Sequence, residues 1–167
     1  MTLTLLVVAA LAALNPFRVA RVAPLEPQRR RHAAMLGGAT SLVVVAAAAA
    51  LSGPVVDALS ISGSSTRIAA GVALVLTSLR DLIAPDPAPE PALSGALAGF
   101  VPVAVPTLLS PAVVLLALSA GHERGLVVAV AGLALGLGIA TGAVAMGSRS
   151  TLRGAGRVYA VAGGAVG

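Results

Sequence analysis

An all-α membrane protein is predicted, with five full transmembrane helices, a short sixth helix and two inverted three-helix repeats. Three observations lead to this fold class. The composition is 57% hydrophobic and only 10% charged, with a mean hydropathy of +0.99, which exceeds the values of soluble domains. The apolar residues form runs close to the ~20 residues that cross a ~30 Å hydrocarbon core. The first and fourth runs each contain a polar residue followed by proline, which predicts broken helices.

Five apolar runs have transmembrane length, and a sixth is shorter. The full-length runs are Thr2–Ala20, Ala33–Leu51, Ile68–Ala84, Leu93–Ser119 and Leu126–Met146. The last run, 155–167, reaches only ~20 Å as a helix, so we expect it to enter the membrane without crossing it fully. The first run also has the length of a signal-peptide core. No basic residue precedes it, which favours a retained first helix.

A proline-rich segment divides the chain into halves. Proline occupies every second position from 85 to 91, which prevents a helix and favours an extended linker. We therefore predict a first repeat at 1–84, a cytoplasmic linker at 85–92 and a second repeat at 93–167. Three crossings per repeat give the two repeats opposite orientations, and each repeat begins with a broken helix.

The arginines predict the orientation in the membrane. Nine of the eleven follow the first, third and fifth runs, and the remaining two, Arg67 and Arg124, lie on the other side. By the positive-inside rule, the N-terminus lies outside a bacterial plasma membrane and the 22–33 loop lies in the cytoplasm. The Arg29–Arg31 triplet fits this topology signal, with binding of anionic lipid as the alternative. Because the arginines alternate with apolar runs, we predict no nucleic-acid binding despite the net charge of +5.

The two breaks, Asn15-Pro16 and Ser110-Pro111, carry the functional prediction. Asn and Ser favour the N-cap position and Pro favours the first helical position, so each break is expected to start a half-helix. Free amide groups at the positive end of such a helix favour an anion, for example the carboxylate of an amino acid. The alternative is an ordinary proline kink whose freed carbonyls find partners on neighbouring helices.

Six residues form the predicted substrate site near mid-membrane, where the two breaks are expected to flank one cavity. Arg18 follows Asn15 by three residues and is able either to pair with a carboxylate or to extend to the cytoplasmic interface. Thr107 lies four residues before Pro111, which cannot donate to its carbonyl. The six are Asn15, Pro16, Arg18, Thr107, Ser110 and Pro111.

Three segments carry motifs that are similar to those of a known family. They are Leu14–Phe17, then Ile61–Gly63 with Thr66–Gly71, and then Val101–Ala112. In these segments the chain resembles the MarC-like integral membrane proteins, which are placed near the lysine-exporter superfamily. The chain departs from the family pattern at Arg18, Ser110 and Ala112, where the family has glycine. The resemblance implies a six-helix inverted-repeat fold and export of a small solute, such as a small neutral amino acid.

Two classes of function remain after this reading. The chain has no enzyme signature, no cysteine and no cluster of metal ligands in its sequence, so neither an enzyme, a cofactor nor a metal site is predicted. The first class is a secondary transporter or exporter, and the alternative is a small non-transporting subunit of a larger envelope complex. Four glycines in the fifth run allow close helix packing, either within the chain or against a second copy or membrane partner. They are Gly132, Gly136, Gly138 and Gly142.

Overall fold

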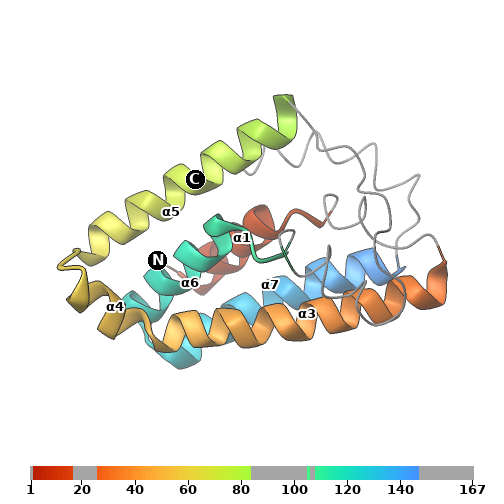
Figure 1. Cartoon of the computed structure of the whole chain (residues 1–167), viewed down its shortest axis with the longest axis horizontal. Coiled ribbons are helices and arrows are strands. Elements are labelled where there is room, and N and C mark those ends of the chain that lie inside the picture. The colour runs from red at the N-terminus through yellow and green to blue at the C-terminus, as the bar shows by residue number, and fades with distance from the viewer. Residues whose placement is uncertain (1, 17–25, 84–104, 106–107, 147–167) are drawn as a thin grey trace.

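Six helices make up most of the chain that the structure describes, and no strand occurs among these residues. The computed structural model describes residues 2–16, 26–83, 105 and 108–146. Its helices are α1 (Leu3–Leu14), α3 (Pro27–Ala50), α4 (Ser52–Ala58), α5 (Gly63–Ile83), α6 (Pro111–Arg124) and α7 (Leu126–Met146) (Figure 1). The prediction of an all-α protein is confirmed for this part of the chain.

Local chemistry explains several helix ends. The Thr2 hydroxyl accepts a hydrogen bond from the Leu5 amide at 3.2 Å and caps the start of α1. Pro27 is the first residue of α3, a position where the missing amide hydrogen costs nothing. Gly125 ends α6 with a φ of 79°, which a residue with a side chain adopts only with strain. Since α7 starts at the next residue, this single glycine joins the two helices.

The chain bends by 105° between α4 and α5. Ser60 lies in the bend with a φ of 51°, in the left-handed region. The Ser62 hydroxyl then accepts from the Ser65 amide at 3.2 Å and stabilises the first turn of α5. The third helix therefore begins at Gly63, earlier than the predicted start at Ile68, because a serine cap extends it beyond its apolar run.

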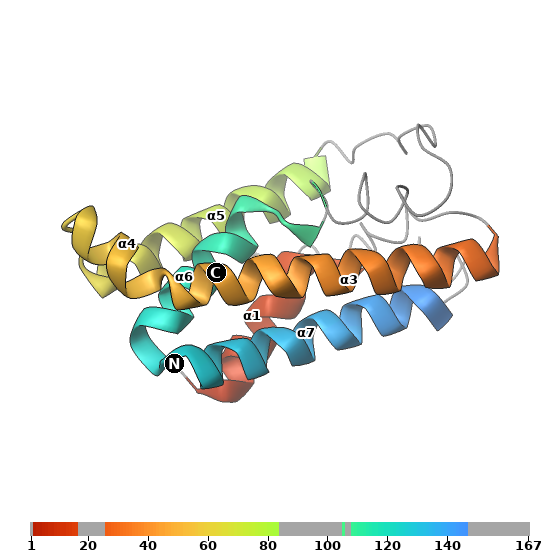
Figure 2. The same ribbon diagram turned by 60° about the horizontal axis from the view of Figure 1, so that its bottom comes forward.

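The helices alternate in direction. In Figures 1 and 2, α1, α5 and α7 run one way along the long axis, whereas α3 and α6 run the opposite way. The contacts of α7 agree with this, since Gly132 faces Leu6 and Gly136 faces Ala10, in the same order along both helices. A chain that crosses a membrane repeatedly has helices of alternating direction in the same way.

Among the described residues, two helices are long and apolar enough to cross a membrane by themselves, Gln28–Ala50 and Leu126–Met146. A third span results if the bent pair of α4 and α5 is counted as one. The prediction of five full spans is therefore not confirmed. The described helices α1 and α6 contain only 12 and 14 residues, or about 18 and 21 Å of helix. The predicted linker at 85–92 and the short element at 155–167 lie outside the described residues, and the inverted repeat is not confirmed.

Small side chains dominate the core where the helices meet. Buried alanines lie on α1, α3, α6 and α7, and a few larger residues, such as Leu6, Leu133 and Val144, fill the space between them. Glycines bring the backbones closer still: a Cβ at Gly121 would overlap the Ala49 carbonyl. This composition allows close helix approach, as in membrane bundles, where packing of small residues replaces the hydrophobic driving force.

The described arginines are divided unevenly between the two ends of the bundle. Arg29–Arg31 lie in the first turns of α3, and Arg80 lies in the last turn of α5. Because α3 and α5 run in opposite directions, these four lie at one end (Figure 2). Arg67 and Arg124 lie near the other end, at the start of α5 and the end of α6. The described residues thus keep the charge bias on which the predicted orientation rests.

Candidate binding site at the ends of α1 and α6

Asn15 ends α1 in a left-handed conformation, with φ 38° and ψ 84°. Its backbone amide donates to the Leu11 carbonyl at 3.1 Å, and only 5% of the residue is exposed. Asn is among the few residues that adopt this conformation readily. The prediction of a break at Asn15-Pro16 is confirmed, but Asn15 is the C-cap of the helix before it. Pro16 is buried and helical, and the residues that follow it lie outside the described part of the chain.

Ser110 and Pro111 begin α6 as predicted. Ser110 is the N-cap, with extended backbone angles of φ −67° and ψ 153°, and Pro111 is the first helical residue. The amides of Val113 and Val114 both donate to the Ser110 carbonyl, at 3.0 and 3.2 Å. The expected capping bond from the Ser110 side chain is absent. Its hydroxyl is instead buried without a hydrogen-bond partner among the described residues, and only 2% of the residue is exposed.

The two interrupted helix ends lie at a similar depth. Thr2 at the start of α1 and Ala120 and Arg124 near the end of α6 line one small pocket, so both helices reach the same end of the molecule. From there, α1 and α6 extend inward by about 18 and 21 Å. Figures 1 and 2 both show the C-terminal end of α1 near the N-terminal end of α6. Asn15 and Ser110 therefore lie at about half the ~36 Å length of the 24-residue α3.

The electrostatics of this junction differ from the expectation. Sequence reasoning placed two helix N-termini beside one cavity, whereas the described residues bring a C-terminus, that of α1, to the N-terminus of α6. The carbonyl end of a helix carries about −0.5 charge and the amide end about +0.5. The junction therefore offers a partial negative charge and a partial positive charge. Such a pair suits a zwitterion better than a simple anion.

Four of the six predicted site residues are thus at the junction: Asn15, Pro16, Ser110 and Pro111. Their surroundings are apolar, since Leu14, Leu108 and Ala112 belong to one buried cluster. Arg18 and Thr107 lie outside the described residues. The sequence did not single out Ser41 on α3, whose hydroxyl is also buried and has no partner in the part of the chain that the structure describes. The signal available in the sequence was a serine next to Thr40 in the middle of the apolar run Ala33–Leu51.

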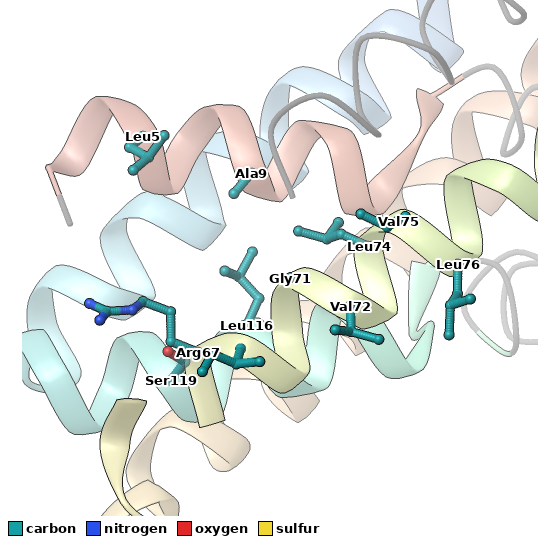
Figure 3. Close-up of a pocket in the computed structure, with 11 residues that line it drawn as sticks. Leu5, Ala9, Arg67, Gly71, Val72, Leu74, Val75, Leu76, Leu116 and Ser119 are labelled. Atoms are coloured by element: carbon teal, nitrogen blue, oxygen red, sulfur yellow. The ribbon is translucent and has the colours of Figure 1, made fainter. Parts of the chain in front are cut away.

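A larger cavity lies between α1, α5 and α6, and sequence reasoning did not predict it. Its volume is about 700 Å³, and it opens to the surface. Figure 3 shows Leu5 and Ala9 of α1 on one side, Leu116 and Ser119 of α6 on another, and α5 along its length. Arg67 is its only charged lining residue among those described. The cavity is therefore apolar with a cation at one end.

No protein-family model, curated protein or solved structure matches this chain. The likeness to MarC-like proteins therefore rests on the sequence motifs alone.

Proposed function

We propose that this protein is a secondary transporter of the bacterial plasma membrane, with its N-terminus outside, that exports a small neutral amino acid. One observation carries the proposal: the Ser110 hydroxyl is buried without a partner at the amide end of α6, beside the carbonyl end of α1. A buried hydroxyl without a hydrogen bond costs free energy. Such a group in a native structure needs an explanation, and its place at the start of α6 favours satisfaction by a ligand.

The junction offers donors and acceptors for both charged groups of an amino acid. Pro111 has no amide hydrogen and the Val113 and Val114 amides donate to Ser110, so the Ala112 amide and the Ser110 hydroxyl are the donors for a carboxylate. At the end of α1, Pro16 cannot donate to the Ala12 carbonyl, which makes that oxygen an acceptor for an ammonium group. Broken helices in transporters bind anionic groups at helix N-termini and cations at C-terminal carbonyls.

The test is amino-acid efflux from loaded proteoliposomes, with Ser110→Ala as the variant and Ser41→Ala as its control. Both substitutions remove one buried hydroxyl that has no partner, so their effects on the fold are matched. Loss of one hydrogen bond to a charged group corresponds to about a tenfold lower flux. We expect this loss for Ser110→Ala and wild-type flux for Ser41→Ala. Absence of efflux for every neutral amino acid, or equal flux in both variants, would contradict the proposal.

The alternative function, a small non-transporting subunit, is favoured by a different observation on α7. Gly132 and Gly136 are covered by Leu6 and Ala10 of α1, so the predicted partner seam does not include these two glycines. A Cβ at Gly138 or Gly142 would meet nothing within 4 Å.

Leu135 and Ile139 are exposed next to this open face of α7, with 53% and 52% of each residue accessible. The natural chain has no cysteine, which makes Gly138→Cys a clean cross-linking probe, with Gly53→Cys as a control on α4. Disulfide-linked dimers of Gly138→Cys, together with none for Gly53→Cys, would support a homo-oligomer through this face. Co-purification of a fixed second protein with wild type would favour the subunit function.

A further inference from the structure

The cavity between α1, α5 and α6 has the form of a site for a lipid chain with an anionic headgroup. Its lining residues are Leu5, Ala9, Ile68, Gly71, Val72, Leu74, Val75, Leu76 and Leu116, together with Arg67 and Ser119. Except for the last two, none of these side chains offers a hydrogen bond or a charge. An apolar cavity of about 700 Å³ is within the size range of small-molecule sites and is suited to an aliphatic chain.

The position of Arg67 makes the two ends of the cavity chemically different. It lies in the second turn of α5, close to the end of the helix, and Leu76 lies nine residues further along, or about 14 Å deeper. In Figure 3 the guanidinium lies at one end of the cavity, whereas Leu74, Val75 and Leu76 lie toward the other. An occupant is therefore expected to hold its charged group near the membrane surface and its chain along α5.

Within the residues 2–16, 26–83, 105 and 108–146, the charge of Arg67 is only partly compensated. One guanidinium nitrogen lies 3.5 Å from a carboxylate oxygen of Glu123 on α6, and 59% of the Arg67 side chain is exposed. A guanidinium has five N–H donors arranged to contact phosphate or carboxylate oxygens. With Glu123 as its one long contact among the described residues, Arg67 keeps most of these donors for another acceptor. Glu123 therefore competes with an anionic ligand for Arg67.

We infer that this cavity binds a phospholipid, with an acyl chain between α1, α5 and α6 and with the phosphate of an anionic headgroup on Arg67. Charge complementarity selects this occupant, because a purely apolar partner would use none of the donors that Glu123 leaves on Arg67. This binding site lies apart from the junction of Asn15 and Ser110. It does not depend on the proposed transport function.

Native mass spectrometry of the purified full-length protein tests the inference, with phosphatidylglycerol and phosphatidylcholine of identical acyl chains as the probes. One arginine near the membrane surface contributes about 1 kcal/mol toward an anionic lipid, which corresponds to an approximately fivefold preference. We expect wild type to show this preference for phosphatidylglycerol. Arg67→Gln should remove it, while the control Arg124→Gln, whose residue is absent from this cavity, should keep it.

Glu123→Gln separates lipid binding from a merely structural ion pair. If Arg67 and Glu123 serve only to hold α5 to α6, both substitutions should change the protein in the same way. If lipid phosphate binds Arg67, removal of its competitor should raise the preference for phosphatidylglycerol, opposite to the effect of Arg67→Gln. Equal binding of the two lipids by wild type, or changes of the same sign in both variants, would overturn the inference.

The acyl-chain part of the site has its own variant and control. Gly71→Leu places a side chain in the cavity, so it should weaken binding of both lipids. Gly53→Leu on α4 is the control, because a Cβ there meets nothing within 4 Å and the residue does not line the cavity, and it should leave lipid binding unchanged. A soluble competitor, glycerol 3-phosphate, carries the phosphate without the chains and should not displace bound lipid. Full displacement by this compound, or unchanged lipid binding in Gly71→Leu, would also overturn the inference.

Discussion

Replacement of Ser110 by alanine is expected to make the protein more stable. A serine at an N-cap normally contributes about 1 kcal/mol through a bond from its hydroxyl to the helix amides. Ser110 makes no such bond, and its hydroxyl is buried without a partner. Burial of an unpaired hydroxyl costs about 1–3 kcal/mol. Removal of this oxygen should therefore raise the free energy of unfolding by about 1 kcal/mol.

Thermal unfolding of the detergent-purified protein measures this effect. For a chain of this size, about 1 kcal/mol corresponds to a rise in Tm of roughly 2–4 °C. Ser52→Ala is the contrasting control, because the buried Ser52 hydroxyl donates to the Ala49 carbonyl at 2.7 Å and its loss should lower Tm. A lower Tm for Ser110→Ala would show that the hydroxyl has a partner or caps the helix. The physical basis for a ligand site at Ser110 would then be lost.

Three further predictions concern the fold and its orientation. Asn15→Ala should be less stable than Asn15→Gly by about 1 kcal/mol in chemical unfolding, because only alanine strains the left-handed backbone; equal stability would argue against that conformation. Gly136→Ala should lower Tm, since the added Cβ would lie 2.8 Å from the Ala10 Cβ, whereas Gly138→Ala, which meets nothing, should gain up to about 1 kcal/mol of helix propensity. A reversal of these signs would contradict the α1 and α7 contact. An impermeant thiol reagent on intact cells should label a cysteine at Ser62 but not one at Gln28, and the opposite pattern would reverse the predicted orientation.

The helix breaks could be predicted from the sequence because proline acts locally. The missing amide hydrogen of Pro16 and Pro111 limits the helix whatever surrounds it, and α1 ends and α6 begins beside these residues. The role of Asn15 could not be read in the same way. Asparagine is favourable both before a helix and in the left-handed residue after one. The arrangement of neighbouring helices decides between the two.

The cavity could not be predicted, because its lining comes from three helices that are distant in the chain. In the sequence, Arg67 was one of two arginines on the sparsely charged side and part of the Thr66–Gly71 motif, and neither feature indicated a cavity. Its place at the end of an apolar cavity depends on the bend of 105° between α4 and α5, which sets the path of α5 past α1 and α6. No local pattern in residues 59–62 specifies that angle.

The two glycines of α7 that face α1 allow only one register between these helices. Leu6 lies over Gly132, and the next glycine, Gly136, lies one helical turn further along, where it faces Ala10. A slide of α1 by about 6 Å would move Leu6 from the first glycine to the second. The same slide would bring Ala10 opposite Ala140, and the two Cβ atoms would then meet as closely as in Gly136→Ala, where they would lie 2.8 Å apart. One-turn steps are a known mode of movement between packed helices, but the glycine pair holds α1 in a single register against α7.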